Sequence, residues 1–179
     1  KEFENGVSPY QIAESISSRL ADEVLVANVN ETIVDINSPI ESDATLQLFT
    51  FKDDVGRETY WHSTSHLMAH AIQSLYPEAK FGVGPAIENG FYYDFDLGDE
   101  VISEKDFKKI EDKMLEFARQ KFEFKMREIS KAEALKVYEF NEYKTELIEN
   151  LEDGTITFCD HSDFTELCRG GHIPNPGFI

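Results

Sequence analysis

The chain has 179 residues, and 17 Lys and Arg stand against 35 Asp and Glu, so its formal net charge is −18. A protein this acidic carries no basic coat, which excludes binding to nucleic acid by overall charge and requires a local site for any RNA partner. Hydrophobic residues make up 41% of the chain and aromatic residues 12%, which excludes a disordered acidic tail and allows a packed core.

The two cysteines, Cys159 and Cys168, are too few for a disulfide framework and indicate a reducing compartment. The first residues lack the basic and apolar regions of a signal peptide. Apolar runs such as residues 24–27 have the length of a strand, far short of the roughly 20 residues that cross a bilayer. We therefore expect a cytoplasmic chain with no membrane partner, long enough for one domain or two small ones.

Residues 1–51 are expected to form a small α+β unit. Ser8 begins a capping box with Pro9 at the first helical position, which predicts a helix over residues 9–20. Three short runs rich in Val, Ile, Leu and Phe predict strands at 24–29, 32–36 and 45–51. One helix against a small mixed sheet is the simplest arrangement. Residues 1–54 hold 11 acids and 3 bases, which makes this unit a poor electrostatic partner for phosphate.

The polar segment 52–57 is the predicted boundary between two domains, because it contains a glycine and the texture of the sequence changes after it. Beyond it we expect, in chain order, a helix over 59–76, a hairpin over 79–96 with its tight turn at Asn89-Gly90, an amphipathic helix over about 104–121, a strand at 122–126, a helix from Ser130 and a strand over 155–159. Residues 92–96 are either a strand with alternating faces or part of a functional motif. The Gly- and Pro-rich end of the chain suggests a domain that is cut off there.

All five histidines and both cysteines lie in two clusters, one on a predicted helix and one near the end of the chain. The first holds His62, His66 and His70, which share one helix face because they are four residues apart. The second comprises Cys159, His161, Cys168 and His172. Three imidazoles and a thiolate form a tetrahedral set for zinc, and the same set without metal offers general bases around an ester carbonyl. Simpler interpretations are packing for His70, a small buried hydrophobe for Cys159 and a solvated surface lysine for Lys144.

Several motifs together resemble one family. They are His62-Ser-Thr-Ser-His66, Leu75-Tyr76-Pro77, the run from Gly84-Pro85 to Asp94-Phe95-Asp96, and Cys168-Arg169-Gly170-Gly171-His172-Ile173-Pro174-Asn175. This set resembles the amino-terminal half of bacterial threonyl-tRNA synthetase. The resemblance implies a β-grasp, ubiquitin-like TGS domain over 1–51, without its first strand, and an α+β editing domain over 52–179, with helices packed on an antiparallel sheet and its C-terminal end missing.

The resemblance also implies an activity, the hydrolysis of the ester in mischarged seryl-tRNA(Thr). It assigns His62 and His66 to the attacking water, Cys168 and His172 to the opposite wall, and Lys144 to the developing oxyanion or a phosphate. Tyr93 and Glu166 are assigned to substrate binding, Tyr93 near the ribose or adenine. Two departures from the family are expected to matter at the site: Gly171 stands where proline is common, and Glu166 stands where aspartate is frequent.

Cofactors and partners follow from the same resemblance. We expect no required metal in the editing site, and if zinc is bound its ligands are His62, His66, Cys168 and His172. The aminoacylation core, with its ATP, Mg and zinc, and the anticodon domain are not part of this region, so the chain itself is not expected to charge tRNA. The partner is the acceptor end of tRNA(Thr) with its seryl ester. The full-length enzyme is expected to dimerise through its core, and this region to be a monomer.

Two alternatives have no hydrolytic activity. The chain is then an RNA-recruitment module that tracks the acceptor stem with the bases at 105, 108, 109, 113, 119 and 121, or a structural zinc module. The cluster of His and Cys residues argues against the first alternative, because RNA docking alone does not need it. The second alternative requires that the chain retains bound zinc.

Overall fold

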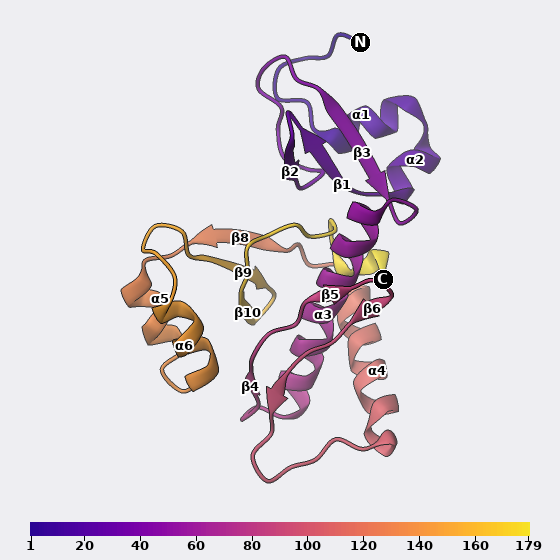
Figure 1. The fold of residues 1–179 in the computed structure, drawn as a ribbon. Coiled ribbons are helices and arrows are strands. Elements are labelled where there is room, and N and C mark those ends of the chain that lie inside the picture. Colours follow the sequence, from indigo (N-terminus) through magenta and orange to yellow (C-terminus); the bar gives the residue numbers. More distant parts are fainter.

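The computed structural model describes residues 1–179 and has an α+β fold, with one small region above and a larger one below (Figure 1). The helices are α1 (Pro9–Ile16), α2 (Ser18–Glu23), α3 (Asp54–Leu75), α4 (Glu104–Gln120), α5 (Lys131–Val137) and α6 (Glu142–Glu149), with a 3-10 turn η1 (Pro176–Phe178). The strands are β1 (Val24–Val29), β2 (Thr32–Val34), β3 (Leu46–Thr50), β4 (Lys80–Phe81), β5 (Ala86–Ile87), β6 (Gly90–Phe91), β7 (Phe95–Asp96), β8 (Lys125–Glu128), β9 (Thr157–His161) and β10 (Phe164–Leu167).

The helix predicted over residues 9–20 is two helices. Its start is as predicted, because the Ser8 hydroxyl accepts the Gln11 N–H at 3.3 Å and the Gln11 side chain accepts the Ser8 N–H at 2.9 Å. Ser17 then adopts an extended conformation, and its hydroxyl accepts the Leu20 N–H at 3.1 Å. The prediction of one helix is wrong because a serine within the apolar pattern ends α1 and caps α2.

The sheet of the small region is antiparallel throughout, with strand order β2-β1-β3, so the mixed sheet we predicted is wrong. Asn30 and Glu31 both have positive φ and form the two-residue turn that joins β1 to β2, the geometry that matches the twist of paired strands. A small apolar core lies between this sheet and its helices. Its members are Ala13, Ala21, Val24, Ala27 and Ile36.

The predicted boundary at 52–57 is mostly the start of α3, which begins at Asp54, five residues before the predicted helix. Asp53 precedes it, and its carboxylate accepts the Thr50 N–H at 2.8 Å, which ties the helix start to the end of β3. A Cβ on Gly56 would lie 1.9 Å from the carbonyl oxygen of Thr50. The glycine therefore serves close packing between α3 and β3 rather than a flexible linker.

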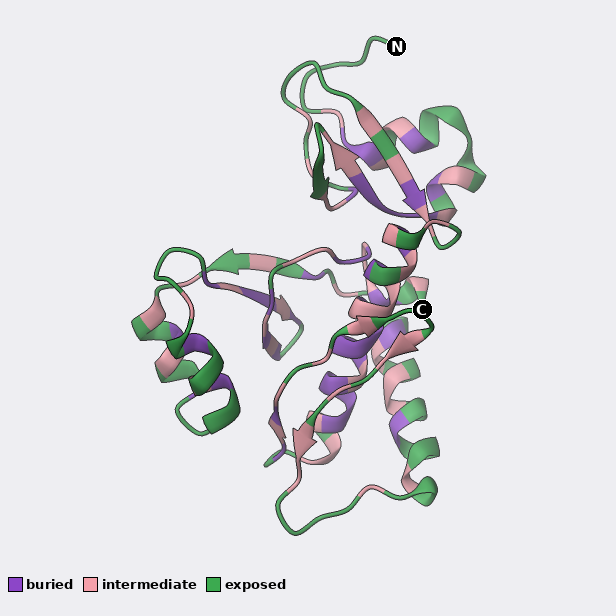
Figure 2. Ribbon diagram, in the orientation of Figure 1, coloured by how far each residue is buried: buried purple, intermediate pink, exposed green.

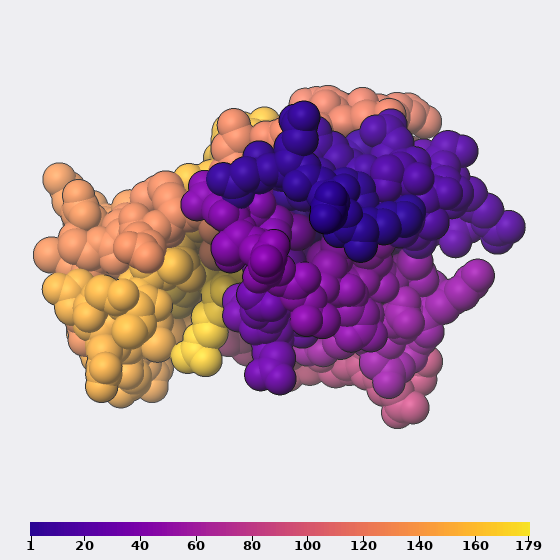
Figure 3. Space-filling view, turned by 90° about the horizontal axis from the view of Figure 1, so that it is seen from above, coloured from indigo at the N-terminus to yellow at the C-terminus, as the bar shows by residue number.

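The small region also contributes to the core of the larger one. Leu25 of β1 is buried in a cluster with Phe124, Cys159, Cys168 and Ile173. In a view from above, the indigo N-terminal residues lie against purple segments of the chain, and the orange and yellow segments form a lobe beside them (Figure 3). The two regions thus share a packed interface beside the second cysteine and histidine cluster.

In the larger region α3 runs beside α4, and the antiparallel sheet β10-β9-β8 lies across from them with α5 and α6 beyond it (Figure 1). Burial concentrates along α3 and on β9 (Figure 2). The core between α3, α4 and β10 contains the buried side chains of Ala69, Ala71, Ile72, Ala79, Phe81, Ile110 and Phe164. None of the helices is long and apolar enough to cross a bilayer.

Several predicted boundaries in the larger region are shifted. The hairpin pairs β5 with β6 and β4 with β7, but Ile87 pairs with Gly90, so the turn residues are Glu88 and Asn89 rather than Asn89 and Gly90. Of residues 92–96 only the last two are strand. The strands predicted at 122–126 and 155–159 begin three and two residues later. Neither β10 nor α6 was predicted, because both are short and their pattern is set by long-range packing.

Candidate functional site

The long helix α3 presents the first two histidines to a common site. The rings of His62 and His66 lie 4.7 Å apart, centroid to centroid, as their spacing of four residues requires. His66 is 2% exposed, whereas His62 is half-buried. One turn further on, His70 binds the Asp163 carboxylate at 2.8 Å and stacks on Phe117, so it packs away from the site as predicted.

The loop after β10 brings the second pair of residues to α3. Cys168 follows the strand directly, and His172 returns to the helix because Gly170 and Gly171 have φ of +96° and +82°. Residues with a Cβ rarely adopt such angles, and proline, fixed near −65°, cannot. The glycine at 171 therefore does more than loosen the loop. It allows a backbone turn that proline at this position would not.

Cys168 and two histidines form a chain of hydrogen bonds. The Cys168 Sγ lies 3.1 Å from His62 Nε2 and 3.3 Å from His172 Nε2, and His172 Nδ1 lies 3.2 Å from the Ser63 hydroxyl. Ser63 donates its proton to the Thr59 carbonyl at 2.8 Å. His172 must then donate from Nδ1, which leaves its Nε2 to accept the Cys168 S–H, while His62 donates to the sulfur.

Burial sets the charge of these groups. It lowers the pKa of His62 to about 4 and holds the pKa of His66 and His172 well below the ordinary value, in both cases with help from neighbouring histidines. It raises the pKa of the Cys168 thiol to about 11. At neutral pH the site therefore holds three uncharged imidazoles and a protonated thiol, which agrees with the hydrogen-bond directions.

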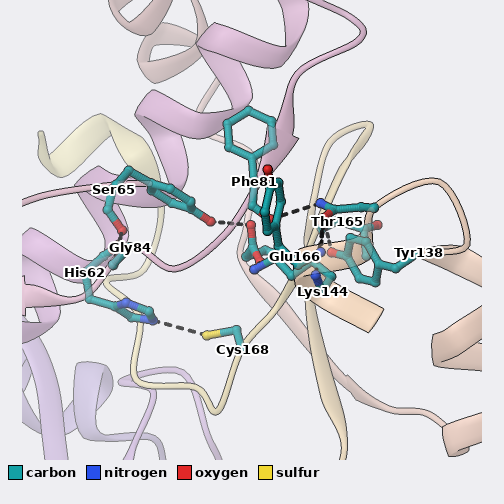
Figure 4. Close-up of polar contacts among 12 residues, drawn as sticks. His62, Ser65, Phe81, Gly84, Tyr138, Lys144, Thr165, Glu166 and Cys168 are labelled. Carbon is teal, nitrogen blue, oxygen red and sulfur yellow. Dashed lines mark hydrogen bonds and ion pairs between the residues drawn. The ribbon is translucent and has the colours of Figure 1, made fainter. Parts of the chain in front are cut away.

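A buried ion pair lies on the other side of the site, where Glu166 contacts Lys144 (Figure 4). Glu166 also accepts a hydrogen bond from the Tyr93 hydroxyl. The side chains of Lys144 and Glu166 are each 3% exposed. Burial, followed by the charge of Glu166, raises the pKa of Tyr93 well above its ordinary value, so its hydroxyl remains a donor. Lys144 is not the solvated surface lysine of the simpler interpretation.

The sequence did not reveal what holds Lys144. Asn141 caps α6 by accepting the N–H groups of Tyr143 and Lys144 at 3.1 and 3.2 Å, and it donates to the Phe81 carbonyl at 2.9 Å. Asn141 before a polar helical segment was a readable cap signal. Ser63, which orders the tautomer of His172, gives no signal in the sequence because its partners are about 110 residues away.

These side chains line one cavity of about 320 Å³. Six of the seven predicted site residues border it, namely His62, His66, Tyr93, Lys144, Glu166 and Cys168. His172 is 1% exposed and reaches the cavity only through Cys168. The predicted placement of Cys168 and His172 on the wall opposite His62 is wrong, because both contact the His62 ring. The cavity thus combines neutral proton acceptors on one wall with a fixed ammonium and a phenol on the other.

Two sets of residues have the donor atoms for a metal. The potential ligand atoms of His62, His66, Cys168 and His172 lie within 4.8 Å of one another, and so do those of His66, Cys159 and His161. The first set fits the tetrahedral chemistry of zinc. Three of its four members, His62, Cys168 and His172, bind one another without a metal, whereas His66 Nδ1 is buried without a partner. The aromatic rings of Phe122, Phe124 and Phe164 surround His161.

The basic face of α4, the basis of the RNA-recruitment alternative, is partly neutralised. Lys108 pairs with Asp112 at 2.9 Å and Lys113 with Glu116 at 2.6 Å on the same helix. Two of the six bases are therefore already matched by neighbouring acids, which does not favour a docking helix.

The chain is similar to a known domain family and to several known proteins. Residues 1–50 match the TGS domain, so the chain contains a TGS domain of the type expected from the sequence. All 179 residues align at 58% identity with the threonine–tRNA ligase of Flavobacterium johnsoniae. The enzyme of Parabacteroides distasonis is 54% identical and that of Porphyromonas gingivalis 47% identical, again over the whole chain. The chain is therefore homologous along its entire length to the amino-terminal region of threonine–tRNA ligases.

The chain spans about 28% of the length of these relatives. The resemblance on which the sequence analysis relied is thus confirmed for this region. The activity of the whole ligase does not follow from it, because the matched region is little more than a quarter of those proteins.

Proposed function

We propose that this chain is the editing region of a threonine–tRNA ligase and hydrolyses the ester of seryl-tRNA(Thr). The observation that carries the proposal is the single cavity bordered by the uncharged His62 and His66 and by the buried Lys144–Glu166 pair. The whole ligase would attach threonine to tRNA(Thr) with ATP. The homologous relatives are named threonine–tRNA ligases. The TGS and editing domains would meet near residue 51.

Such an enzyme needs a second site for a physical reason. Serine lacks only the methyl group of threonine, and one missing methyl group in a binding pocket changes affinity by roughly 10 to 200-fold. An editing pocket that admits serine but clashes with the extra methyl group removes the product that the first site fails to reject. A cavity of about 320 Å³ with fixed polar walls suits a small amino-acid ester.

Hydrolysis in this cavity requires a proton acceptor for water. The His66 side chain forms no hydrogen bond, and its Nδ1 is buried without a partner, whereas the His62 side chain already binds Cys168. The two imidazoles position the water, and one takes its proton as the oxygen attacks the carbonyl carbon. The tetrahedral intermediate then collapses with cleavage of the bond to the ribose oxygen, which receives the proton. Free serine and tRNA leave.

The opposite wall stabilises the charge that develops. The Lys144 ammonium is the one fixed cation that faces the ester carbonyl, and Tyr93 supplies a neutral donor for the ribose. Glu166 positions both groups through its two oxygens. Cys168 and His172 keep the His62 ring in one orientation. No metal takes part in this scheme, and elemental analysis that found one equivalent of zinc after dialysis would replace it with the zinc alternative.

The test is deacylation of Ser-tRNA(Thr) and Thr-tRNA(Thr) by this chain. We expect loss of the seryl ester only, and a loss of rate of roughly 100-fold or more in His66→Ala. His70→Gln is the matched control, because His70 is a buried histidine of the same helix outside the cavity. The same substitutions in the full-length enzyme separate an inactive fragment from a wrong assignment. If His62→Ala and His66→Ala each leave editing intact there, the proposal fails.

A further inference from the structure

A second cavity adjoins the first and shares three of its lining residues. It measures about 470 Å³ and lies between the small region and the larger one, since Ile33 of β2 and the start of α3 both border it. The two cavities share His62, Pro85 and Arg169. Arg169 therefore borders both cavities, and it is the one cationic side chain that does so.

Arg169 is a cation without an interaction partner in the chain. Its side chain is exposed and forms no ion pair or hydrogen bond, although most other arginines of the chain have a carboxylate partner. The only other Lys or Arg that borders either cavity is Lys144, which is bound to Glu166. Because the chain has a net charge of −18, a polyanion can bind only where a cation is locally available. The free guanidinium of Arg169 provides such a cation.

The backbone beside it offers further donors. The N–H of Gly171 has no hydrogen-bond acceptor within the chain, and Gly171 borders the second cavity. The N–H of the preceding Gly170, by contrast, is bound to the Cys168 sulfur at 3.3 Å. An N–H next to a planar guanidinium suits the several oxygens of a phosphate. Arg169 is the single cation that borders the second cavity and Glu58 the single carboxylate, so Arg169 is the side chain there that can bind an anion.

We propose that Arg169 binds the phosphate of the terminal nucleotide of the RNA substrate, and that the second cavity receives the nucleotide before it. This inference rests on the proposed function, in which the ester of the terminal ribose lies beside His62. The phosphate attached to that same nucleoside is the nearest anion of the substrate, and it leaves the first cavity at the junction that Arg169 occupies. Base identity plays no part in this contact, because phosphates carry no sequence information.

The decisive experiment compares a phosphate with its neutral analogue. Binding of this chain is measured to a short RNA that ends in the acceptor sequence of tRNA(Thr), and to the same RNA with a methylphosphonate between its last two nucleotides. We expect the wild-type chain to prefer the natural phosphate by roughly ten-fold, and Arg169→Ala to abolish that preference. Arg169→Ala is also expected to reduce the slope of log Kd against log salt by about 1.

Arg119→Ala is the matched control, because Arg119 is likewise exposed and unpaired but lies on α4, away from both cavities. It should retain the full preference for the phosphate. The proposal is overturned if the wild-type chain binds both RNAs equally, or if Arg169→Ala keeps the wild-type preference.

A second measurement separates this inference from the editing activity. Seryl-adenosine carries the ester but no phosphate, so Arg169→Ala should hydrolyse it at the wild-type rate while its KM for seryl-tRNA(Thr) rises. A parallel loss on both esters would overturn the role of Arg169 as a phosphate ligand. If neither this chain nor the full-length enzyme hydrolyses either ester but the chain retains the phosphate preference, the proposed function fails and the phosphate site stands.

Discussion

The two regions of this protein bury different kinds of side chain. The small region around β1 packs alanine, valine and isoleucine, and its one buried polar side chain is Ser8, which caps α1. The region after Asp54 buries a lysine, a glutamate and four histidines at comparable depth. Burying polar and charged groups costs stability unless they are paired, so their concentration in one region indicates a functional site rather than a better core.

The largest effect should come from breaking the buried ion pair. Glu166→Ala leaves the Lys144 ammonium buried without its anion, which should lower the free energy of unfolding by roughly 3 to 5 kcal/mol in a urea titration. The double variant Lys144→Met with Glu166→Leu replaces the ion pair with apolar side chains, like those in the core of the small region. It should recover most of the lost stability, but it should have no deacylation activity.

The exposed pair of Lys80 with Glu142 provides the control for this experiment. Lys80→Met should change the free energy of unfolding by less than about 1 kcal/mol, because solvent screens that pair. Equal losses in Glu166→Ala and in the double variant would show that the pair stabilises the fold on balance.

The second-largest loss of stability should come from the junction between the two regions. In Gly56→Ala the new methyl group would overlap the Thr50 carbonyl, so α3 must shift away from β3. We expect a loss of roughly 1 to 3 kcal/mol in thermal or urea unfolding. Gly154→Ala is a useful comparison, because its positive φ strains an alanine without any steric overlap. An unchanged stability in Gly56→Ala would mean that the two regions are not tightly packed there.

Acid should weaken the larger region first. The folded chain holds the pKa of His62 near 4, whereas an unfolded histidine titrates near 6.5, so the unfolded state binds more protons as the pH falls between these values. Stability is therefore complete above about pH 6.5 and declines towards pH 4, by about 1.4 kcal/mol per pH unit for each such histidine. Unfolding measured at pH 7, 6 and 5 checks this, and His172→Gln should flatten the decline. A stability that stays constant over this range would contradict it.

The smallest effect should come from the helix cap in the small region. Ser8→Ala removes the acceptor for the Gln11 N–H at the start of α1 and should cost about 1 kcal/mol. Deacylation should not change, since the capping box lies outside the residues that border the cavity. A loss of activity larger than the loss of stability would indicate that the small region directly controls the site.

Short-range patterns were predicted best. The capping boxes at Ser8 and Ser130 form as expected, and so does the amphipathic helix from residue 104, because each depends on residues three or four positions apart. Errors occurred where a nearby residue competed with the pattern or where partners lay far along the chain. Ser17 divides one predicted helix into two, and packing against Thr50 extends α3 to Asp54.

The sequence by itself determined the acidic character of the chain, the resemblance to its family and the pairing of His62 with His66 on one helix face. Only the tertiary structure decided that Cys168 bonds to His62 across 106 positions, that Glu166 holds Lys144, and that Arg169 stands between two cavities. The reason is physical. Helical spacing follows from local backbone geometry, whereas the contacts between α3, α6 and the loop after β10 depend on how separate elements pack, which no short stretch of sequence encodes.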